Sequence, residues 1–255
     1  MANLSVDDRT LLDAILAPGG VQSLFQPIVE LRGGQRTTFG HEGFVRGPKG
    51  TRLESPANLF RWAGERGLTE LVDRVSVTSV LEGAARIPGD AALFLNVSAS
   101  TLVSDVSFAA FLRTTAAGAG FPLSRVIVEI VGMSSRWEND YFFDALDALR
   151  QMHVPISLDD VGLGHSNYKT ILDVRPDFLK VDRYFVDGCH ADTRRLAVLA
   201  SVADLGRRLG ARAAVEGVED QRDLEVMEFV DVSLFQGYLF APATTVESLV
   251  ASASK

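Results

Sequence analysis

Cysteine is almost absent from this sequence, since Cys189 is the single one in 255 residues. One cysteine cannot build a disulfide framework, and it excludes a zinc site that depends on several thiolates. A catalytic thiol would need a neighbouring group that lowers its pKa. We therefore interpret Cys189 as an inert thiol in a loop.

Long apolar runs are missing as well. No stretch reaches the roughly 20 apolar residues that a membrane-spanning helix requires. The first residues also lack the basic segment and apolar run that are typical of a signal peptide. These absences predict a cytoplasmic protein without a membrane partner.

Positive charge is in the minority. The 25 lysines and arginines face 33 aspartates and glutamates, which gives a formal net charge of -8. Proteins that hold nucleic acid by its phosphates need clustered basic residues, so we do not expect DNA as a partner. An acidic chain can still bind a phosphate-bearing small ligand if metal ions supply the positive charge.

Apolar residues, in contrast, are plentiful at 47% of the chain, which is enough for a full core. The length suits one α/β barrel. A helix is predicted near the N-terminus, because Ser5 fits an N-cap, Leu11 and Ile15 recur at helical spacing, and Pro18 and Gly19 follow. We assign residues 1–20 to this helical segment and residues 21–255 to one barrel domain.

Short apolar runs alternate with longer segments of helical period along the rest of the chain. Strands are predicted at 24–29, 38–45, 92–97, 126–130, 156–159, 178–181, 212–215 and 232–236, with helices between most of them, such as 60–66, 68–85, 141–152 and 194–209. This order predicts a (β/α)8 barrel of the TIM type, and an open doubly wound sheet is the alternative. The tight turn at residues 32–34 joins the first two strands without a helix, so the first strand is predicted to be antiparallel.

Polar side chains stand at or near the carboxyl ends of these strands, the face on which such barrels do chemistry. They are Glu42, Asn96, Glu129, Asp159, Asp160, Lys180, Glu216 and Gln236. Each alone has a structural explanation, such as a strand edge or a solvated strand end. Together they predict a bound cation, because buried unpaired carboxylates cost several kcal/mol.

The ligands in this set are carboxylate and amide oxygens, which favours magnesium or manganese over zinc. Four or five carboxylates can hold two ions roughly 3.5 to 4 Å apart, and such a pair can bind a phosphodiester and activate water. Lys180 would have its pKa lowered by the ions and by burial, and would orient or deprotonate that water. His41 should point to the other face of its strand, and we interpret neither His41 nor His165 as a ligand.

Eight motifs in order, between about residue 24 and residue 242, resemble those of the EAL domain family. They are Phe25-Gln26-Pro27-Ile28, Gly40-His41-Glu42-Gly43-Phe44-Val45-Arg46, Leu95-Asn96-Val97-Ser98, Val128-Glu129-Ile130, Leu158-Asp159-Asp160-Val161-Gly162, Leu179-Lys180-Val181-Asp182, Val215-Glu216-Gly217-Val218-Glu219 and Phe235-Gln236-Gly237-Tyr238-Leu239-Phe240. The resemblance implies an EAL-type barrel that hydrolyses cyclic di-GMP to linear pGpG with two Mg²⁺ or Mn²⁺ ions.

The resemblance also implies a role for each matching residue. One ion would be held by Glu42, Asn96, Glu129 and Asp159, and the other by Asp159, Asp160 and Glu216. Lys180 would act on the water, with Glu42 and Glu216 as further catalytic residues. Gln236 would position water or ligand, and Gln26 and Arg46 would contact the dinucleotide.

The sequence departs from the family pattern at several positions. The namesake Glu-Ala-Leu reads Glu-Gly-Phe here, and the second Glu of the fourth-strand motif is Gly132. In the loop after the fifth predicted strand, Leu163 and His165 replace the family's threonine and tyrosine. Losses of such supporting groups typically reduce activity by about 10- to 100-fold.

Three functions therefore stay open at this point. The chain can be a weak or conditional phosphodiesterase, a degenerate barrel that binds cyclic di-GMP without cutting it, or a protein-interaction module. We expect no attached sensory or cyclase domain, and therefore expect control from a regulatory protein partner or from a homodimer.

Overall fold

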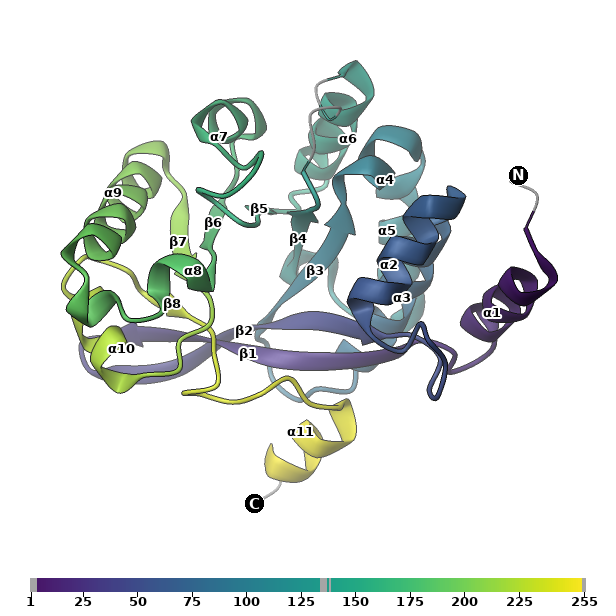
Figure 1. Cartoon of the computed structure of the whole chain (residues 1–255), viewed down its shortest axis with the longest axis horizontal. Coiled ribbons are helices and arrows are strands. Elements are labelled where there is room, and N and C mark those ends of the chain that lie inside the picture. Colours follow the sequence, from purple (N-terminus) through teal and green to yellow (C-terminus); the bar gives the residue numbers. More distant parts are fainter. Residues whose placement is uncertain (1–3, 134–136, 138, 254–255) are drawn as a thin grey trace.

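Eight strands close into one barrel, in chain order, in the computed structural model (Figure 1). The structure describes residues 4–133, 137 and 139–253. The strands are β1 (Gln22–Arg32), β2 (Gln35–Arg46), β3 (Ala92–Ser98), β4 (Val126–Val131), β5 (Ile156–Leu158), β6 (Phe178–Val181), β7 (Arg212–Val215) and β8 (Leu234–Phe235). The predicted TIM-like barrel is confirmed, and the doubly wound alternative is wrong.

The predicted antiparallel first strand is also confirmed. β1 pairs antiparallel with β2 from Gln22↔Arg46 to Arg32↔Gln35, and its other neighbour β8 is antiparallel as well. The remaining neighbours pair in parallel. Gly33 and Gly34 form the turn with φ of 57° and 77°, a left-handed pair of conformations that glycine adopts without strain.

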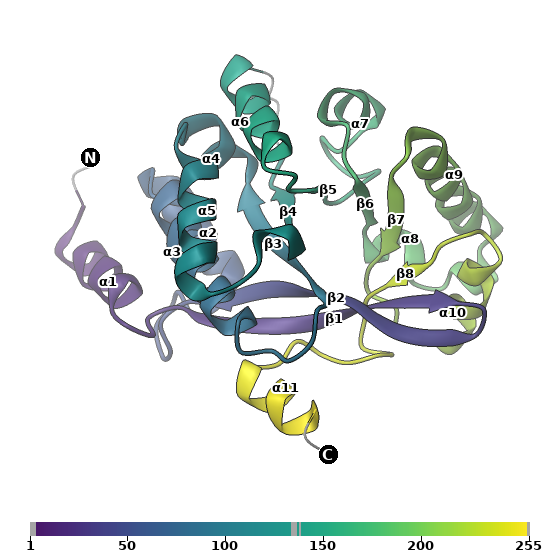
Figure 2. The ribbon, with the colours of Figure 1, turned by 180° about the vertical axis from the view of Figure 1, so that it is seen from behind.

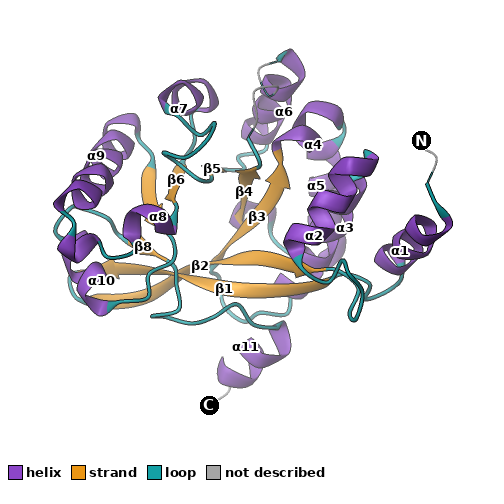
Figure 3. Cartoon of the chain, in the orientation of Figure 1, coloured by secondary structure: helices purple, strands orange, loops and turns teal. Residues whose placement is uncertain are grey.

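Helices surround the barrel (Figures 2 and 3). They are α1 (Val6–Leu16), α2 (Pro56–Arg66), α3 (Thr69–Ala84), α4 (Ala99–Ser104), α5 (Phe108–Ala119), α6 (Asp140–Gln151), α7 (Tyr168–Val174), α8 (Arg183–Val186), α9 (Thr193–Leu209), α10 (Gln221–Glu228) and α11 (Val246–Ala253), with 3-10 turns η1 (Leu123–Arg125) and η2 (Cys189–Ala191). Among the described residues, no helix has both the length and the apolar character that crossing a membrane requires.

Some predicted bounds differ from the observed ones for local reasons. α2 begins a full turn before residue 60, because Ser55 caps it and Pro56 fits its first turn. β5 ends before Asp159, since the next residue, Asp160, takes a left-handed φ of 54°. β8 begins only at Leu234, after Asp231 turns the chain with φ 65°.

The N-terminal helix α1 lies against α2. Ser5 caps it as predicted, by accepting a hydrogen bond from the Asp8 amide. The Asp8 carboxylate accepts from Trp62 Nε1 at 2.9 Å and from Arg66 Nε at 2.7 Å. The boundary between 1–20 and 21–255 remains a proposal, and residues 1–3 and 254–255 lie outside the described part.

An apolar layer fills one end of the barrel interior. It consists of Ile28, Phe94, Ile127, Phe178, Ala214 and Leu234, with Phe94 and Phe178 edge to face at 5.2 Å. Side chains two positions apart on a strand share a face. Two residues further toward the carboxyl end stand Asn96, Glu129, Lys180, Glu216 and Gln236, so the polar residues form the next layer, on a closed apolar floor.

Candidate active site

The centre of the polar layer is the ammonium group of Lys180. Its Nζ lies 2.7 Å from Glu42 Oε2 and 2.6 Å from Glu129 Oε1, and it also pairs with Glu216. The Lys180 side chain is 1% exposed. Strands β2, β4 and β6 and the end of β7 therefore bring one cation and three carboxylates together inside the barrel.

Hydrogen bonds to the same carboxylate fix the neighbouring amides. Glu42 accepts from Asn96 Nδ2 at 2.8 Å and from Gln236 Nε2 at 2.9 Å, in addition to Lys180. Gln236 Nε2 also lies 3.1 Å from Gln26 Oε1, and Gln26 Nε2 donates to the Ala241 carbonyl. Glu42 is thus the shared acceptor of the layer, which holds its oxygens in one orientation.

Backbone hydrogen bonds position the residues that follow the short strands. Asp159 N donates to Ile130 O, Glu216 N to Val181 O and Gln236 N to Val215 O, at 3.3, 3.0 and 2.9 Å. The ladder thereby continues one residue past β5, β7 and β8. This continuation is why Asp159, Glu216 and Gln236 keep the inward direction that strand alternation predicts.

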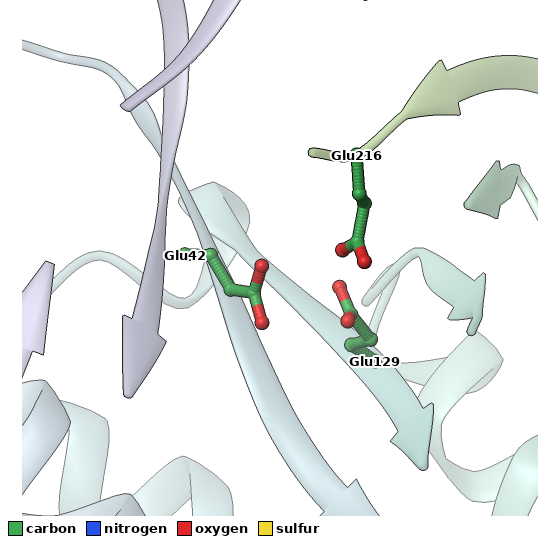
Figure 4. Close-up of side chains that lie close together, drawn as sticks. All are labelled: Glu42, Glu129 and Glu216. Carbon is green, nitrogen blue, oxygen red and sulfur yellow. The ribbon is translucent and has the colours of Figure 1, made fainter. Parts of the chain in front are cut away.

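Three carboxylates converge in this layer (Figure 4). Glu42, Glu129 and Glu216 each offer an oxygen within 4.8 Å of the others. Burial raises the pKa of Glu129 well above its usual range, and Glu42 raises it further, while Lys180 lowers it. Burial likewise raises the pKa of Glu216 and of Asp159, against a lowering by Lys180. One ammonium group does not balance four acidic groups.

The same carboxylates act on the lysine. Burial alone lowers the pKa of Lys180, but Glu129, Glu216, Glu42 and Asp159 raise it more, so that it lies well above its usual value. We expected bound cations to lower this pKa. The carboxylates outweigh burial, so the ammonium serves as the counter-ion of the cluster, and a lowering of its pKa by bound cations stays a prediction.

Several buried oxygens in this layer lack a hydrogen-bond partner among the described residues. They include Glu129 Oε2, Asp159 Oδ1 and Gln236 Oε1. Buried polar atoms without a partner are rare in folded proteins, and they mark places where an ion or water belongs. Carboxylate and amide oxygens in excess of their counter-charge fit a hard divalent cation such as Mg²⁺ or Mn²⁺.

A cavity of about 610 Å³ opens onto the layer. Its lining includes Gln26, Glu42, Asn96, Asp159, Glu216 and Gln236 at one end, and it extends to α2 and α3 at the other. Arg183 is the basic residue of this lining within the described chain, and its guanidinium pairs with Glu219 at 3.3 Å. The strand-end pattern did not identify Arg183, because it follows β6 in α8.

Two predicted site residues lie apart from the cavity. Arg46 is exposed at the end of β2 and lines a separate hollow with Gln22 and Thr244. Asp160 is exposed, and its pKa is raised by burial of part of the group and by the neighbouring charge of Asp182. The structure does not bring either side chain to the carboxylate cluster.

The histidines and the cysteine lie outside the cluster as well. His41 is half-buried on the other side of β2, where burial and then Arg125 lower its pKa. His165 is exposed in the loop after β5. Cys189 is buried in η2, and burial raises the pKa of its thiol to about 12, so it is not an activated nucleophile.

The family model of the EAL domain matches residues 8–243 of this chain. The chain belongs to the EAL domain family. A Sinorhizobium fredii relative, the uncharacterised protein y4lL, is 31% identical over 94% of this chain and 29% of its own length. The probable cyclic di-GMP phosphodiesterase PdeG of Escherichia coli is 26% identical over 97% of this chain and 49% of its own.

Solved structures agree with this assignment. BlrP1 of Klebsiella pneumoniae, in a complex with calcium and cyclic di-GMP, superposes with a TM-score of 0.81 at 26% identity. The superposition covers 91% of this EAL domain and 59% of that chain. This chain therefore spans less than two thirds of each of these relatives.

The supporting positions of this EAL domain are altered in specific ways. Gly132 has φ of 68°, and a Cβ built there would meet nothing within 4 Å. A glutamate at this position would have space but would require a left-handed backbone, at a cost of about 1 to 2 kcal/mol. Glycine therefore suits the left-handed backbone at this position, which carries no carboxylate.

The glycine of Glu42-Gly43-Phe44 has a packing reason. A Cβ on Gly43 would lie 2.3 Å from Cγ1 and 3.2 Å from Cγ2 of Val80 on α3. Real Cβ atoms do not approach so closely, so the helix would have to move away. The missing methyl group lets α3 lie directly against β2.

We predict that Gly43→Ala, which writes the family's second letter into this chain, destabilises the protein by about 1 to 3 kcal/mol through overpacking. Denaturant unfolding measures the change. The double variant Gly43→Ala/Val80→Ala should recover most of the loss, since the clash is with Val80. A single variant as stable as the unmodified protein would contradict the close approach of α3.

Proposed function

We propose that this chain is a metal-dependent phosphodiesterase that opens cyclic di-GMP to linear pGpG. The observation that carries the proposal is the cluster of Glu42, Glu129 and Glu216 around Lys180, with uncompensated oxygens at the end of a large cavity. The relative PdeG is named a probable cyclic di-GMP phosphodiesterase, and BlrP1 was solved with this dinucleotide and calcium or manganese.

Two divalent cations would supply positive charge for a phosphodiester and an activated water. One would be held by Glu42, Asn96, Glu129 and Asp159, and the other by Asp159, Asp160 and Glu216. Lys180 is anchored by hydrogen bonds to Glu42 and Glu129, which leaves it little freedom of orientation. Its ammonium group would orient the attacking water and stabilise negative charge on the reacting phosphate.

Two other side chains would position the substrate. Gln236 donates to Gln26 and Glu42, so its amide is held in place while Oε1 remains available as an acceptor for water. Arg183 can leave its exposed pair with Glu219 for a phosphate oxygen, because exposed ion pairs contribute only about 0 to 1 kcal/mol. We propose Arg183 for this contact, since Arg46 lines a different hollow.

The second candidate is a receptor that binds cyclic di-GMP without cutting it. The position of Asp160 favours this receptor function, because the proposed ligand is exposed and follows a strand end in a left-handed conformation. Two-metal hydrolysis needs both ions, so a weak second site would reduce turnover more than binding. Cytoplasmic location, a homodimer and a regulatory protein partner stay predictions beside either function.

Incubation of the purified chain with cyclic di-GMP in EDTA, Mg²⁺ or Mn²⁺ tests the proposal. We expect pGpG only with a divalent ion, together with binding by calorimetry in Ca²⁺. Binding without pGpG at millimolar Mn²⁺ would establish the receptor. If the chain neither binds cyclic di-GMP nor forms pGpG, the proposal is refuted and the protein-interaction function remains.

A further inference from the structure

The barrel interior contains a buried serine that the proposed mechanism does not use. Ser157 is the middle residue of β5 and is 0% exposed. Its neighbours Ile156 and Leu158 belong to the two apolar clusters that join the barrel wall to the helices. Because successive side chains of a strand point to opposite faces, Ser157 points into the barrel.

Ser157 lies at the boundary between the polar layer and the apolar floor. It pairs in register with Glu129 of β4 on one side and with Phe178 of β6 on the other. Neighbouring strands lie about 4.8 Å apart, so the side chains of Ser157 and Glu129 leave the wall side by side. Asp159 follows two residues later on the same inner face, one step closer to the carboxyl-terminal mouth.

Three buried oxygens at this boundary have no hydrogen-bond partner among the described residues. They are Ser157 Oγ, Glu129 Oε2 and Asp159 Oδ1. The floor side chains next to the serine, Ile127 and Phe178, are apolar, so the unfilled acceptors beside the hydroxyl are those of the two carboxylates. Buried polar groups without a partner are rare, and three of them at one place indicate a shared partner.

One water molecule would satisfy all three oxygens. A serine hydroxyl can donate, whereas an ionised carboxylate only accepts, so the water would accept from Ser157 and donate to Glu129 and Asp159. Buried waters typically make about three hydrogen bonds to polar groups that otherwise lack a partner. Each carboxylate has about four lone-pair positions, so both side chains can still bind a metal ion.

We propose that Ser157 is a positioning residue of the metal site, which holds Glu129 and Asp159 through one buried water. Lys180 Nζ contacts Glu129 at Oε1 only, and the water holds Oε2, so the plane of the carboxylate is fixed before an ion binds. The inference rests on the proposed function, because both carboxylates are proposed ligands of the first ion.

Calorimetry with Mn²⁺ alone, without nucleotide, tests this role. Ser157→Ala should lower Mn²⁺ affinity about 10- to 100-fold, as is typical when a group that orients metal ligands is lost. The rise of the thermal unfolding midpoint in Mn²⁺ should shrink accordingly. The midpoint in EDTA should change little, because alanine fits a buried position and leaves no polar group there without a partner.

A second variant separates hydrogen bonding from packing. Ser157→Cys fills at least the same space but carries only a weak S–H donor. Cysteine would restore a packing role in full and a hydrogen-bonding role in part, so we expect Mn²⁺ affinity to fall in the order serine, cysteine, alanine. A crystal structure with Mn²⁺ should show one water about 3 Å from Ser157 Oγ and from both carboxylates.

Ser76→Ala is the matched control. Ser76 is 5% exposed and its Oγ also lacks a hydrogen-bond partner among the described residues, but it belongs to α3 and not to a strand. This variant removes an equally buried hydroxyl and should leave Mn²⁺ affinity unchanged.

The outcomes distinguish the inference from the proposed function. Unchanged Mn²⁺ affinity in Ser157→Ala, or an equal loss in Ser76→Ala, would overturn the inference while the proposed function stands. Full recovery in Ser157→Cys, or a Mn²⁺-bound structure without the water, would overturn it as well. If the unmodified protein does not bind Mn²⁺, the inference fails together with the metal-dependent function.

Discussion

Lys180→Met should abolish pGpG formation and, in the absence of metal, strongly destabilise the protein. The ammonium group pairs with Glu42, Glu129 and Glu216, and all of these groups except Glu216 are almost fully buried. Removing one partner of a buried ion pair costs about 3 to 5 kcal/mol, because the remaining charges are left without compensation. Methionine keeps the length and apolar stem, so the change is mainly one of charge.

The second half of this prediction concerns metal. Mn²⁺ should restore much of the lost stability, because a divalent ion replaces the missing positive charge among the same carboxylates. Thermal unfolding with EDTA and with Mn²⁺ measures the difference. Cyclic di-GMP binding in Ca²⁺ should persist, since Lys180 is assigned to the water.

Lys49→Met is the matched control, because Lys49 is exposed and does not contact the cluster. This variant should change neither the midpoint of thermal unfolding nor the turnover of cyclic di-GMP. A Lys180→Met protein that is as stable as the unmodified one in EDTA would show that the lysine is not the counter-ion of the cluster. Turnover above about a tenth of the unmodified rate would refute its role in general acid–base or water-orienting catalysis.

The parts of this site that follow from alternation along a strand could be predicted from the sequence. Glu129 and Lys180 each stand two residues beyond an apolar residue, Ile127 and Phe178, and the period of a strand puts both on the same inner face. In a closed barrel the inward side chains of all strands point toward the barrel axis, so those at the same level lie close together. Glu42 needed one further inference, the hairpin at Gly33, which sets the direction of the first strand.

Other parts depend on information that local patterns do not carry. Asp160 lies one residue after a strand end, and its left-handed backbone turns it away from the direction of Asp159. Arg46 ends β2, where the barrel wall stops and the side chain lies in another hollow.

Glu42→Gln should have the opposite pattern from Lys180→Met: turnover falls by about 10²- to 10³-fold while metal-free stability is kept or increased. Glu42 raises the pKa of Glu129 and of Glu216, so its charge opposes theirs inside the barrel. Glutamine removes that repulsion and retains one acceptor oxygen for Lys180 and Gln236. Its amide nitrogen replaces the oxygen that accepts from Asn96 Nδ2, which keeps the Gly43 carbonyl as an acceptor, and Lys180 still pairs with Glu129 and Glu216.

The loss of turnover follows from the same position of Glu42. It accepts hydrogen bonds from Asn96, Lys180 and Gln236, so the missing charge affects one proposed metal ligand and both groups proposed to position water. Rate and Mn²⁺ dependence are measured together with thermal unfolding in EDTA. Glu30→Gln, on β1 and paired with Arg32 and Arg212, is the control carboxylate outside the cavity, and it should leave turnover unchanged. If Glu42→Gln lowers metal-free stability as much as Lys180→Met does, the four acidic groups are not in excess of their counter-charge, and the electrostatic basis for a divalent cation at this site fails.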